Sequence, residues 1–338
     1  MVNPMQFEVD YGRVPYTFLT RQRISNVCEL LWSDEVCGLL RLCGAEEHKI
    51  GEVASDYERF SALCKALPML KRHPIKQAVT DLLKTHFAVS EQPCDITWHT
   101  VAQALEERES APTDFLPREP VSCLLSTIAL PPLPSHISPM LDAEALLHAS
   151  TNALETWREE LRQTLLRFVR AGCHTVRFLL PASYTFTAPT VYHVQEALGM
   201  KKRTLETEHL LRSQLFRELC TICRDMSVRL LLHLSCAGEE AVALLRYAEE
   251  CVGLPHLYWS ADGRANDVLL RFQMQAHEAP VYWVLRLSDV PSDVELETVL
   301  ACVAARYPIT RLRFVCDCDL RLLPTARARL AEALQKTL

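Results

Sequence analysis

The stretch Val228–Leu234, with the sequence VRLLLHL, decides the fold that we expect for this chain. It is a short apolar run, followed by a segment of helical spacing at Glu239–Val252 and by a second short apolar run at His256–Ser260. A strand, a helix and a second strand in this order form a βαβ unit, in which the two strands are parallel. The run is almost continuously apolar rather than alternating, which is typical of a parallel strand buried on both faces.

The same alternation extends over most of the chain. Gly172 stands at the expected end of one helix, a position that glycine favours. Further strands are predicted at Met5–Val9, Cys123–Leu130, His174–Leu180, Val281–Leu287 and Leu312–Cys316, and further helices at Asp142–Ala171, Leu205–Arg224, Ala265–His277, Asp293–Arg306 and Thr325–Lys336. Alternating strands and helices predict an α/β fold, and we expect a (β/α)8 TIM-type barrel, complete or incomplete.

The N-terminal part differs from this pattern. From about Thr20 to residue 110 the spacing of apolar residues is helical and no strand is convincing. Three prolines between Glu109 and Pro120 indicate a linker. We therefore predict three segments: residues 1–19 as the first barrel strand and its loop, 20–110 as an inserted helical subdomain, and 111–338 as the remainder of the barrel.

Composition excludes several classes of protein. The chain has 338 residues, of which 49% are hydrophobic, enough for a large core. The net charge is −6 without a basic stripe, which argues against nucleic-acid binding. No apolar run is long enough for a membrane helix, and the N-terminus lacks a signal-peptide pattern, so we expect a cytoplasmic protein. The fourteen cysteines, including the pair Cys220 and Cys223, are expected to be buried thiols.

Polar residues at the ends of predicted strands are the first candidates for a site. His233 lies near the end of one strand and Asp317 follows the last strand. The carboxyl ends of barrel strands form the active site in enzymes of this fold. The first strand, however, runs into Asp10–Pro15, which contains no histidine. The sequence resembles an enzyme scaffold with part of its site missing.

Several motifs carry a resemblance to the uronate (glucuronate) isomerases of the amidohydrolase superfamily, in order along most of the chain. The segment Ser55–Ala62, with Pro68 and His73–Ile75, resembles the family's D-x-x-K-F-x-A-W…P…N-P-L-Y. The family's Q-L-H-I-G strand, its L-P-x-T-I-L-Y-x-L-N-P-R-D-N stretch and its L-T-D-S-R motif are similar to Leu231–Leu234, to Leu254–Tyr258 with Gly263–Asn266, and to Val315–Cys318.

This resemblance implies a function and a chemistry. Family members interconvert glucuronate or galacturonate with the corresponding keto acid by moving a proton between neighbouring carbons. A divalent metal, held by a His-x-His pair at the first strand and an aspartate at the last, helps to stabilise the charge that develops. The resemblance maps catalytic roles onto His233 and Asp317 and a substrate contact onto Arg264, and Arg13, which stands in place of the family's histidine pair, is a further candidate for substrate contact.

The departures from the family pattern fall on its catalytic motifs. The family's D-Y-H-x-H-L-P is Asp10–Pro15 here, one residue shorter and without histidine. Its Y-H-W-T-H-L-E-L-R-R becomes Lys76–Thr85, its S-D-H becomes Val176–Phe178, and its G-S-G-W-W is reduced to Trp283. At most His233 and Asp317 remain as metal ligands, fewer than the three protein ligands usual in catalytic sites. We expect no cofactor, and a divalent metal such as zinc or manganese only if the chain is catalytic.

Three hypotheses follow. The first is a uronate isomerase-like protein without metal catalysis, a pseudoenzyme that binds a sugar acid or acts as a regulatory module. The second is an active glucuronate or galacturonate isomerase with a rebuilt site, for which His136, His174, His256 and Asp262 are candidates. The third is an interaction protein that acts through the helical subdomain. The sequence leaves open whether the chain is an enzyme, as well as its oligomeric state.

Overall fold

The protein is described by a computed structural model with side chains. The described residues are 11–13, 19, 21, 23–32, 34–51, 53–70, 74–108, 111–116, 121–147, 153–261, 281–286, 312–315, 317–319 and 332. The predicted first strand Met5–Val9 and most of the last three predicted helices lie outside them.

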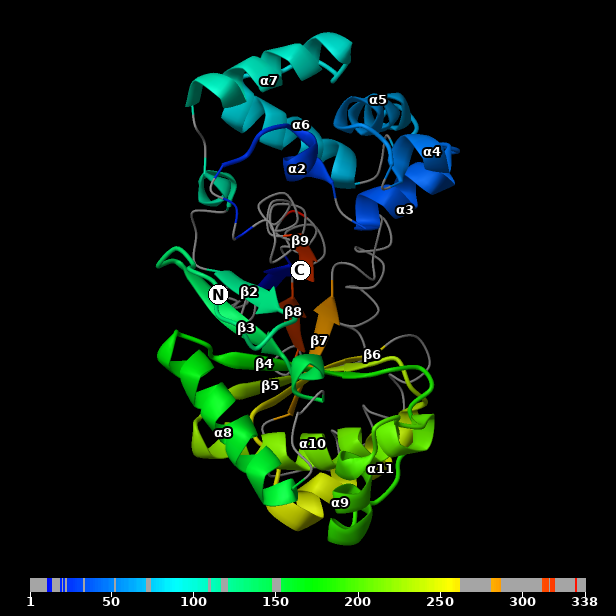
Figure 1. Cartoon of the computed structure of the whole chain (residues 1–338), viewed down its shortest axis with the longest axis vertical. Helices are drawn as coiled ribbons and strands as arrows, with labels where there is room; N and C mark the ends of the chain where they lie inside the picture. The colour runs from blue at the N-terminus through cyan, green and yellow to red at the C-terminus, as the bar shows by residue number, and fades with distance from the viewer. Residues whose placement is uncertain are drawn as a thin grey trace.

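The strands form one parallel sheet at the centre of the molecule (Figure 1). In space the strand order is β8-β7-β6-β5-β4-β3-β2-β1-β9, and each neighbouring pair is parallel. The strands are β1 (Tyr11–Arg13), β2 (Val121–Leu125), β3 (Ile137–Asp142), β4 (Thr175–Leu180), β5 (Arg229–Leu234), β6 (Leu257–Ala261), β7 (Val281–Arg286), β8 (Leu312–Val315) and β9 (Asp317–Asp319).

One stretch of chain closes this sheet. β8 pairs with β7, whereas β9 pairs with β1. A single residue separates β8 from β9 in the sequence, so the two edges of the sheet meet in the segment 312–319. The described strands therefore form a closed barrel in which β8 and β9 are successive parts of the last strand. The predicted TIM-type barrel is confirmed.

The strand missing from the sequence prediction is β3. Its sequence, ISPMLD, follows a run of prolines and contains Pro139, which cannot donate a hydrogen bond to a neighbouring strand. Pro139 is tolerated because β3 pairs with β4 only at Leu141 and Asp142, beyond the proline. The same region was wrongly predicted as the start of a long helix at Asp142.

The segment after the predicted first strand was assigned wrongly. Tyr11–Arg13 was expected to be a loop, but it is β1, paired with β2 on one side and β9 on the other. Gly12 and the nearby proline are turn signals in isolation, and pairing on both sides overrides them. Smaller shifts affect β2, predicted at Cys123–Leu130, and β6, predicted at His256–Ser260.

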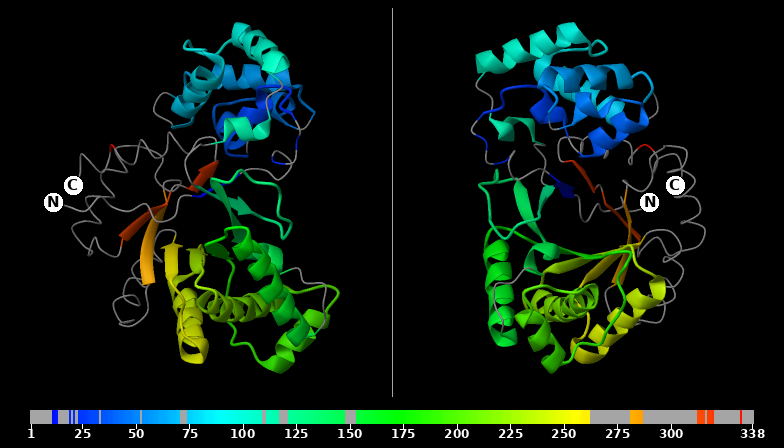
Figure 2. Two further views of the ribbon diagram at one scale, coloured as in Figure 1. Left: turned by 90° about the vertical axis from the view of Figure 1, so that its left-hand side faces the viewer. Right: turned by 45° about the vertical axis from the view of Figure 1, so that its right-hand side comes forward.

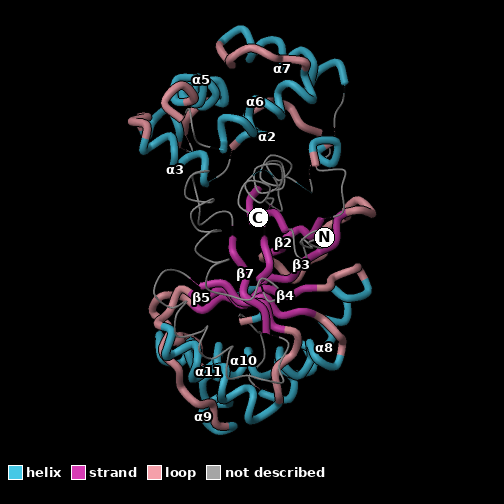
Figure 3. The backbone as a smooth tube through the Cα atoms, turned by 180° about the vertical axis from the view of Figure 1, so that it is seen from behind, coloured by secondary structure: helices cyan, strands magenta, loops and turns pink. Residues whose placement is uncertain are grey.

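The helices lie in two groups, at opposite ends of the molecule, with the strands between them (Figures 1 and 3). One group contains helices and no strand among its described residues, as predicted, and Figure 2 shows it apart from the other group in further views. It comprises α2 (Cys28–Leu31), α3 (Asp34–Leu42), α4 (Glu47–Ile50), α5 (Asp56–Ala66), α6 (Pro74–Phe87) and α7 (Asp95–Arg108). The short 3-10 helix η1 (Pro112–Phe115) lies within the predicted linker.

The second group covers the outside of the barrel. It comprises η2 (Ala143–Leu146), α8 (Leu154–Arg170), α9 (Val191–Gly199), α10 (Leu205–Asp225) and α11 (Gly238–Val252). The helix predicted over Asp142–Ala171 is thus divided into η2 and α8, and α9 was not predicted. None of the helices described is long and apolar enough to cross a membrane.

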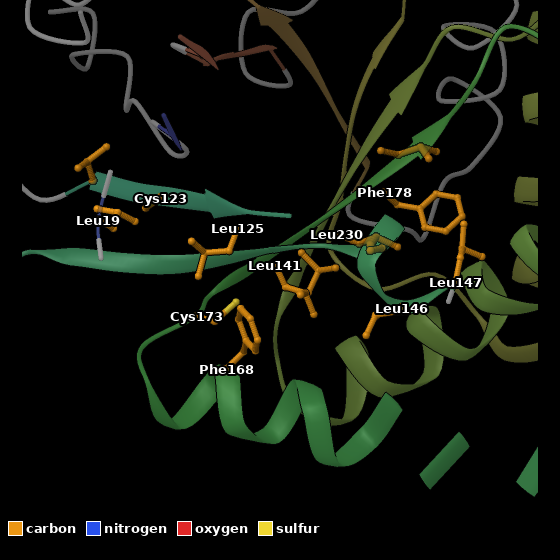
Figure 4. Packing of buried hydrophobic residues seen from close by; sticks show 14 of the residues in the cluster. Leu19, Cys123, Leu125, Leu141, Leu146, Leu147, Phe168, Cys173, Phe178 and Leu230 are labelled. Atoms are coloured by element: carbon orange, nitrogen blue, oxygen red, sulfur yellow. The ribbon is translucent and has the colours of Figure 1, made fainter. Parts of the chain in front are cut away.

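The main core of the barrel lies between the sheet and these helices. Leu125 and Leu141 from the strands face Phe168 and Cys173 at the end of α8 (Figure 4). Further round, the rings of Phe178 on β4 and Phe216 on α10 lie 5.3 Å apart, and both are buried. Each fully buried leucine or phenylalanine contributes about 2 to 3 kcal/mol, so this outer layer supplies much of the stability.

Two helices of this group end in the same hydrogen-bonded motif with different residues. After α8, Gly172 has φ +93° and the N–H of Cys173 donates to Phe168 O at 2.9 Å. After α10, Ser227 has φ +56° and the N–H of Val228 donates to Cys223 O at 2.8 Å. Both are Schellman motifs, and glycine is the residue that adopts their left-handed position without strain.

Exchanging these residues tests the motif. Gly172→Ala is expected to lower the free energy of unfolding by about 1 kcal/mol, since a left-handed residue with a Cβ is strained by roughly that amount. Space does not explain this loss, because a Cβ at Gly172 would meet only Ser138 Oγ at 3.7 Å. Ser227→Gly is expected to stabilise by up to about 1 kcal/mol. Urea unfolding of the two variants measures both effects, and a loss of stability in Ser227→Gly would contradict the assignment.

Candidate functional site

Strand register determines which residues line the inside of the barrel. Phe178 packs on α10, so its neighbours Arg177 and Leu179 point to the other face, inside the barrel. Leu179 is in register with His233 of β5, and His233 with Ser260 of β6. His233 is therefore on the inner wall, in the fifth position of the six-residue strand β5 and close to its carboxyl end.

The same register extends to the predicted residues of the first and last strands. Asp142 is in register with Arg177, and the alternation along β3 places Ser138 on the same face. Ser138 pairs with Ser122, Ser122 with Tyr11, and Tyr11 with Asp317. The backbone positions of Arg13 and Asp317 consequently belong to the inner face, as His233 does. The roles of these residues stay predictions, and Arg264 and Asp262 lie outside the described residues.

The imidazole of His233 is held between hydroxyl groups. Its Nδ1 lies 3.1 Å from Ser260 Oγ, the residue directly across on β6. Its Nε2 lies 3.5 Å from Ser235 Oγ, a long contact. Only 8% of His233 is exposed. This histidine is a buried, hydrogen-bonded group that can exchange hydrogen bonds with a hydroxylated ligand through a small change on the Ser235 side.

A buried ion pair lies on the neighbouring strands. Arg177 Nη1 donates to Asp142 Oδ2 at 3.3 Å, and the two side chains are only 8% and 7% exposed. The other carboxylate oxygen, Oδ1, accepts from the N–H of Glu144 at 3.3 Å, where Asp142 caps η2. Arg177 Nε is buried and has no hydrogen-bond partner among the described residues. In the sequence Arg177 stands out only as a departure from a family motif. Its pairing could not be predicted, because its partner Asp142 lies 35 residues away.

A second arginine fixes the segment that follows Asp142. Arg212 of α10 forms a bidentate ion pair with Glu144 of η2 and also donates to Leu179 O at the end of β4. Bidentate arginine and carboxylate pairs are geometrically specific. Since Glu144 also bonds to Asp142, this bracing from outside the barrel restrains the carboxylate that orients Arg177.

The loop after β4 is held by a separate buried cluster. His209 of α10 accepts the N–H of Thr185 at Nδ1, 3.3 Å away, and its ring lies 5.4 Å from that of Tyr184. The hydroxyl groups of Tyr184 and Ser213 are 2.7 Å apart. His209 Nε2 is buried without a partner. Burial, and secondly the positive charge of Arg212, lower the pKa of His209 below its usual 6.5.

The histidines proposed for a rebuilt site lie at the opposite end of the barrel. His136, His174 and His256 each precede the first residue of a strand, and their carbonyl groups accept hydrogen bonds that begin the pairing of the neighbouring strands. His256 O accepts from Leu230, three residues before His233, a separation of roughly 10 Å along the strand. The expectation that these histidines join His233 is wrong, because each precedes a strand whereas His233 is near the end of one.

The C-x-x-C pair is structural. Cys220 and Cys223 are free, fully buried thiols on the inner side of α10. Burial raises the pKa of both, which keeps them as neutral thiols. The prediction of buried thiols is confirmed for these two residues and is wrong for Cys94 and Cys251, which are exposed.

The residues present do not fit the divalent metal of the family. Such a metal needs histidines at the carboxyl end of the first strand, and β1 has the sequence YGR. Imidazole and carboxylate groups bind zinc, whereas a guanidinium has no lone pair to offer and is positively charged. Within the described part of the chain, no group of three or more histidine, cysteine, aspartate or glutamate residues could hold a metal ion.

Removing one member of the Asp142–Arg177 pair tests its coupling. Arg177→Met leaves a buried carboxylate unpaired, and we expect a loss of about 3 to 5 kcal/mol in the free energy of unfolding. The double variant Asp142→Leu with Arg177→Met should lose much less, since neither charge is then buried. Urea unfolding of the two single variants and the double variant measures the coupling. Additive losses would show that the two side chains do not act as a pair.

The lowered pKa of His209 predicts a pH dependence. The unfolded chain binds a proton at His209 more readily than the folded chain does, so the folded state loses stability as pH falls below 6.5. In His209→Phe this loss is absent, and the stability advantage of the natural protein should shrink on acidification. Urea unfolding across pH 6.5 measures the difference. His193→Phe, at an exposed position of α9, is the control. A difference that does not change with pH would contradict the prediction.

Comparisons with known proteins agree with the barrel and its sequence motifs. The family model of glucuronate isomerase matches residues 22–136. A search of curated proteins finds no significant match. The crystal structure of uronate isomerase from Thermotoga maritima is similar with a TM-score of 0.74 at 14% identity, over 97% of this chain and 87% of that chain. Glucuronate isomerase from Caulobacter crescentus gives 0.63 at 14% identity, over 97% and 84%.

At this level of identity the solved structures establish a shared fold, and the family model adds a match in sequence over the helical segment and β2. The resemblance predicted from the motifs is confirmed in sequence over residues 22–136, and the chain has the TIM-barrel fold of the uronate isomerases that it resembles.

Proposed function

We propose that this protein has lost the metal-dependent catalysis of uronate isomerases and binds a sugar acid at the carboxyl ends of its barrel strands. The observation that carries the proposal is the composition of β1. Its residues Tyr11–Arg13 are paired on both sides, at the place where the family has its histidine pair, and Arg13 is in register with Asp319. Arg13 therefore occupies an inner-face position next to Asp319 on the neighbouring strand.

Electrostatics favours this interpretation over a metal enzyme. Two unit charges 4 Å apart interact by about 4 kcal/mol at an effective dielectric constant of 20, and a divalent ion doubles that value. A guanidinium close to the metal position would oppose the metal by this amount, in addition to the missing imidazole ligands. The same guanidinium favours an anionic ligand.

The inner wall offers the groups that a sugar acid requires. Arg177 supplies a buried positive charge, and His233 and Ser260 supply hydrogen-bonding groups for sugar hydroxyls. Arg13 and Arg264 are further proposed contacts. The active-isomerase alternative receives less support, because three of its four proposed histidine and aspartate groups lie at the amino ends of the strands.

The interaction-protein alternative also receives little support from the described helices. Leu42, Val53 and Ile96 are strongly exposed and lie on different segments, and the exposed Tyr57 and Met69 line one hollow whose lining also includes charged residues. Single exposed apolar residues are common on protein surfaces and do not indicate a partner.

Metal content and ligand binding test the proposal together. The purified protein, incubated with zinc or manganese and then desalted, is expected to contain no stoichiometric metal by elemental analysis. It is expected to bind D-glucuronate or D-galacturonate in calorimetry without isomerising either sugar acid. Stoichiometric metal with turnover that His233→Ala or Asp317→Asn abolishes would overturn the loss of catalysis.

A further inference from the structure

We propose that Arg177, oriented by Asp142, is a buried anchor for the carboxylate of a small singly charged ligand inside the barrel. The inference rests on the proposed binding of a sugar acid and deepens it, because it names the residue that recognises the acid group. Arg177 stands where the resembling family has an S-D-H motif, so this anchor is a property of the present chain.

The Nε–H group of Arg177 is a buried hydrogen-bond donor without an acceptor among the described residues. Arg177 is 7% exposed, and its Nε is fully buried without a hydrogen-bond acceptor. A buried N–H group that lacks an acceptor costs about 1 to 3 kcal/mol, and more when the group is charged. Asp142 occupies only Nη1, at 3.3 Å. A guanidinium presents five donors in a planar fork, and a carboxylate that reaches Nε would satisfy this buried donor.

Arg177 lies on the same inner wall as His233. Arg177 faces the inside of the barrel, and Leu179, two positions closer to the carboxyl end of β4, is in register with His233. With strands about 4.8 Å apart and a rise of about 3.3 Å per residue, the Cα atoms of Arg177 and His233 are roughly 8 Å apart. A ligand whose acid group contacts Arg177 would thus bring its hydroxyl groups to His233 and Ser260.

The carboxylate that orients Arg177 is held rigidly. Asp142 is fixed at both carboxylate oxygens, by Arg177 Nη1 and by the N–H of Glu144. Glu144 is fixed in turn by Arg212, which also bonds to Leu179 O. A guanidinium held in this way loses little conformational freedom on binding, which favours affinity.

The charge of the pair selects the class of ligand. Asp142 neutralises most of the positive charge of Arg177, so the site has a net charge near zero. A ligand with a single, delocalised negative charge can use the free donors of Arg177 with limited repulsion from Asp142. Inorganic phosphate carries between one and two negative charges at neutral pH and would be repelled more strongly. The pair therefore favours a monocarboxylate over phosphate.

The experiment compares ligands of one shape and different charge on the full-length protein. Calorimetry is expected to show binding of D-glucuronate, and no binding of D-glucose, D-glucuronamide or inorganic phosphate. Arg177→Lys keeps the charge opposite Asp142 but lacks Nε–H and the planar fork. We expect it to lower the affinity for D-glucuronate at least tenfold. Arg229→Lys is the matched control, since Arg229 lies on the same wall, over the ring of Tyr258 at 5.8 Å. The affinity of this control variant for D-glucuronate should change less than twofold.

A second variant covers the case in which Arg177→Lys fails to fold. Asp142→Asn retains Arg177 and an oxygen for the N–H of Glu144 but removes the neutralising charge. We expect it to bind D-glucuronate at least as tightly as the natural protein and to acquire measurable binding of inorganic phosphate. Unchanged rejection of phosphate by this variant would contradict the selection by charge.

The outcomes separate this inference from the proposed function. Binding of D-glucuronate that Arg177→Lys leaves intact overturns the anchor and leaves sugar-acid binding standing. No binding of uronates, with Arg177-dependent binding of acetate or lactate, overturns the sugar acid and supports the anchor. Absence of binding to any carboxylate overturns both.

Discussion

The closure of the parallel sheet by the segment 312–319 is the constraint on which the rest of the structure depends. β8 pairs with β7 and β9 pairs with β1. The two ends of the sheet are therefore joined through this one segment, and the described sheet is closed. In a closed sheet the alternation of side chains is fixed around the whole ring. Once Phe178 is seen to pack on α10, the register assigns one face of each described strand to the helices and the other to the interior.

The two walls defined in this way have different chemistry. The outer wall is apolar, with Phe178, Leu232 and Trp259 almost fully buried. The inner wall carries the polar side chains of Arg177 and His233, which are also buried. Burial of apolar side chains supplies stability, whereas a buried ion pair adds little net stability because its attraction is offset by desolvation. Replacement of the whole ion pair by apolar residues is therefore expected to cost the fold little, whereas removal of one partner leaves a buried unpaired charge and costs more.

This difference explains what the sequence could and could not predict. The runs at Val228–Leu234 and Val281–Leu287 are apolar at most of their positions, and they were correctly predicted as parallel strands. β3 was missed because Pro139 is compatible with a strand only where the neighbouring pairing is absent, a fact that depends on β4. Tyr11–Arg13 was wrongly predicted as a loop because its strand conformation comes from pairing with β2 and β9, which are far away in the sequence.

The candidate site shows the same limit. His233 was found from its place at the end of a clear strand, and register agrees with that position on the inner wall. The Asp142–Arg177 pair was not found, because Asp142 was assigned to a helix and Arg177 was considered only against a family motif. A buried ion pair between two strands leaves no local signal in the sequence. It becomes visible only when the register brings the two residues side by side.

The closed sheet also explains how the chain keeps the uronate isomerase fold without the family's histidines. β1 is held through backbone pairing with β2 and β9, and backbone bonds do not depend on side-chain identity. In small zinc domains the metal supplies the folding free energy, but here the outer wall supplies it. Aspartates on an inner wall still need positive charge nearby, because an isolated buried carboxylate is costly. Arg177 supplies that positive charge for Asp142, so this acidic position of the inner wall is compensated by a cation of the protein itself.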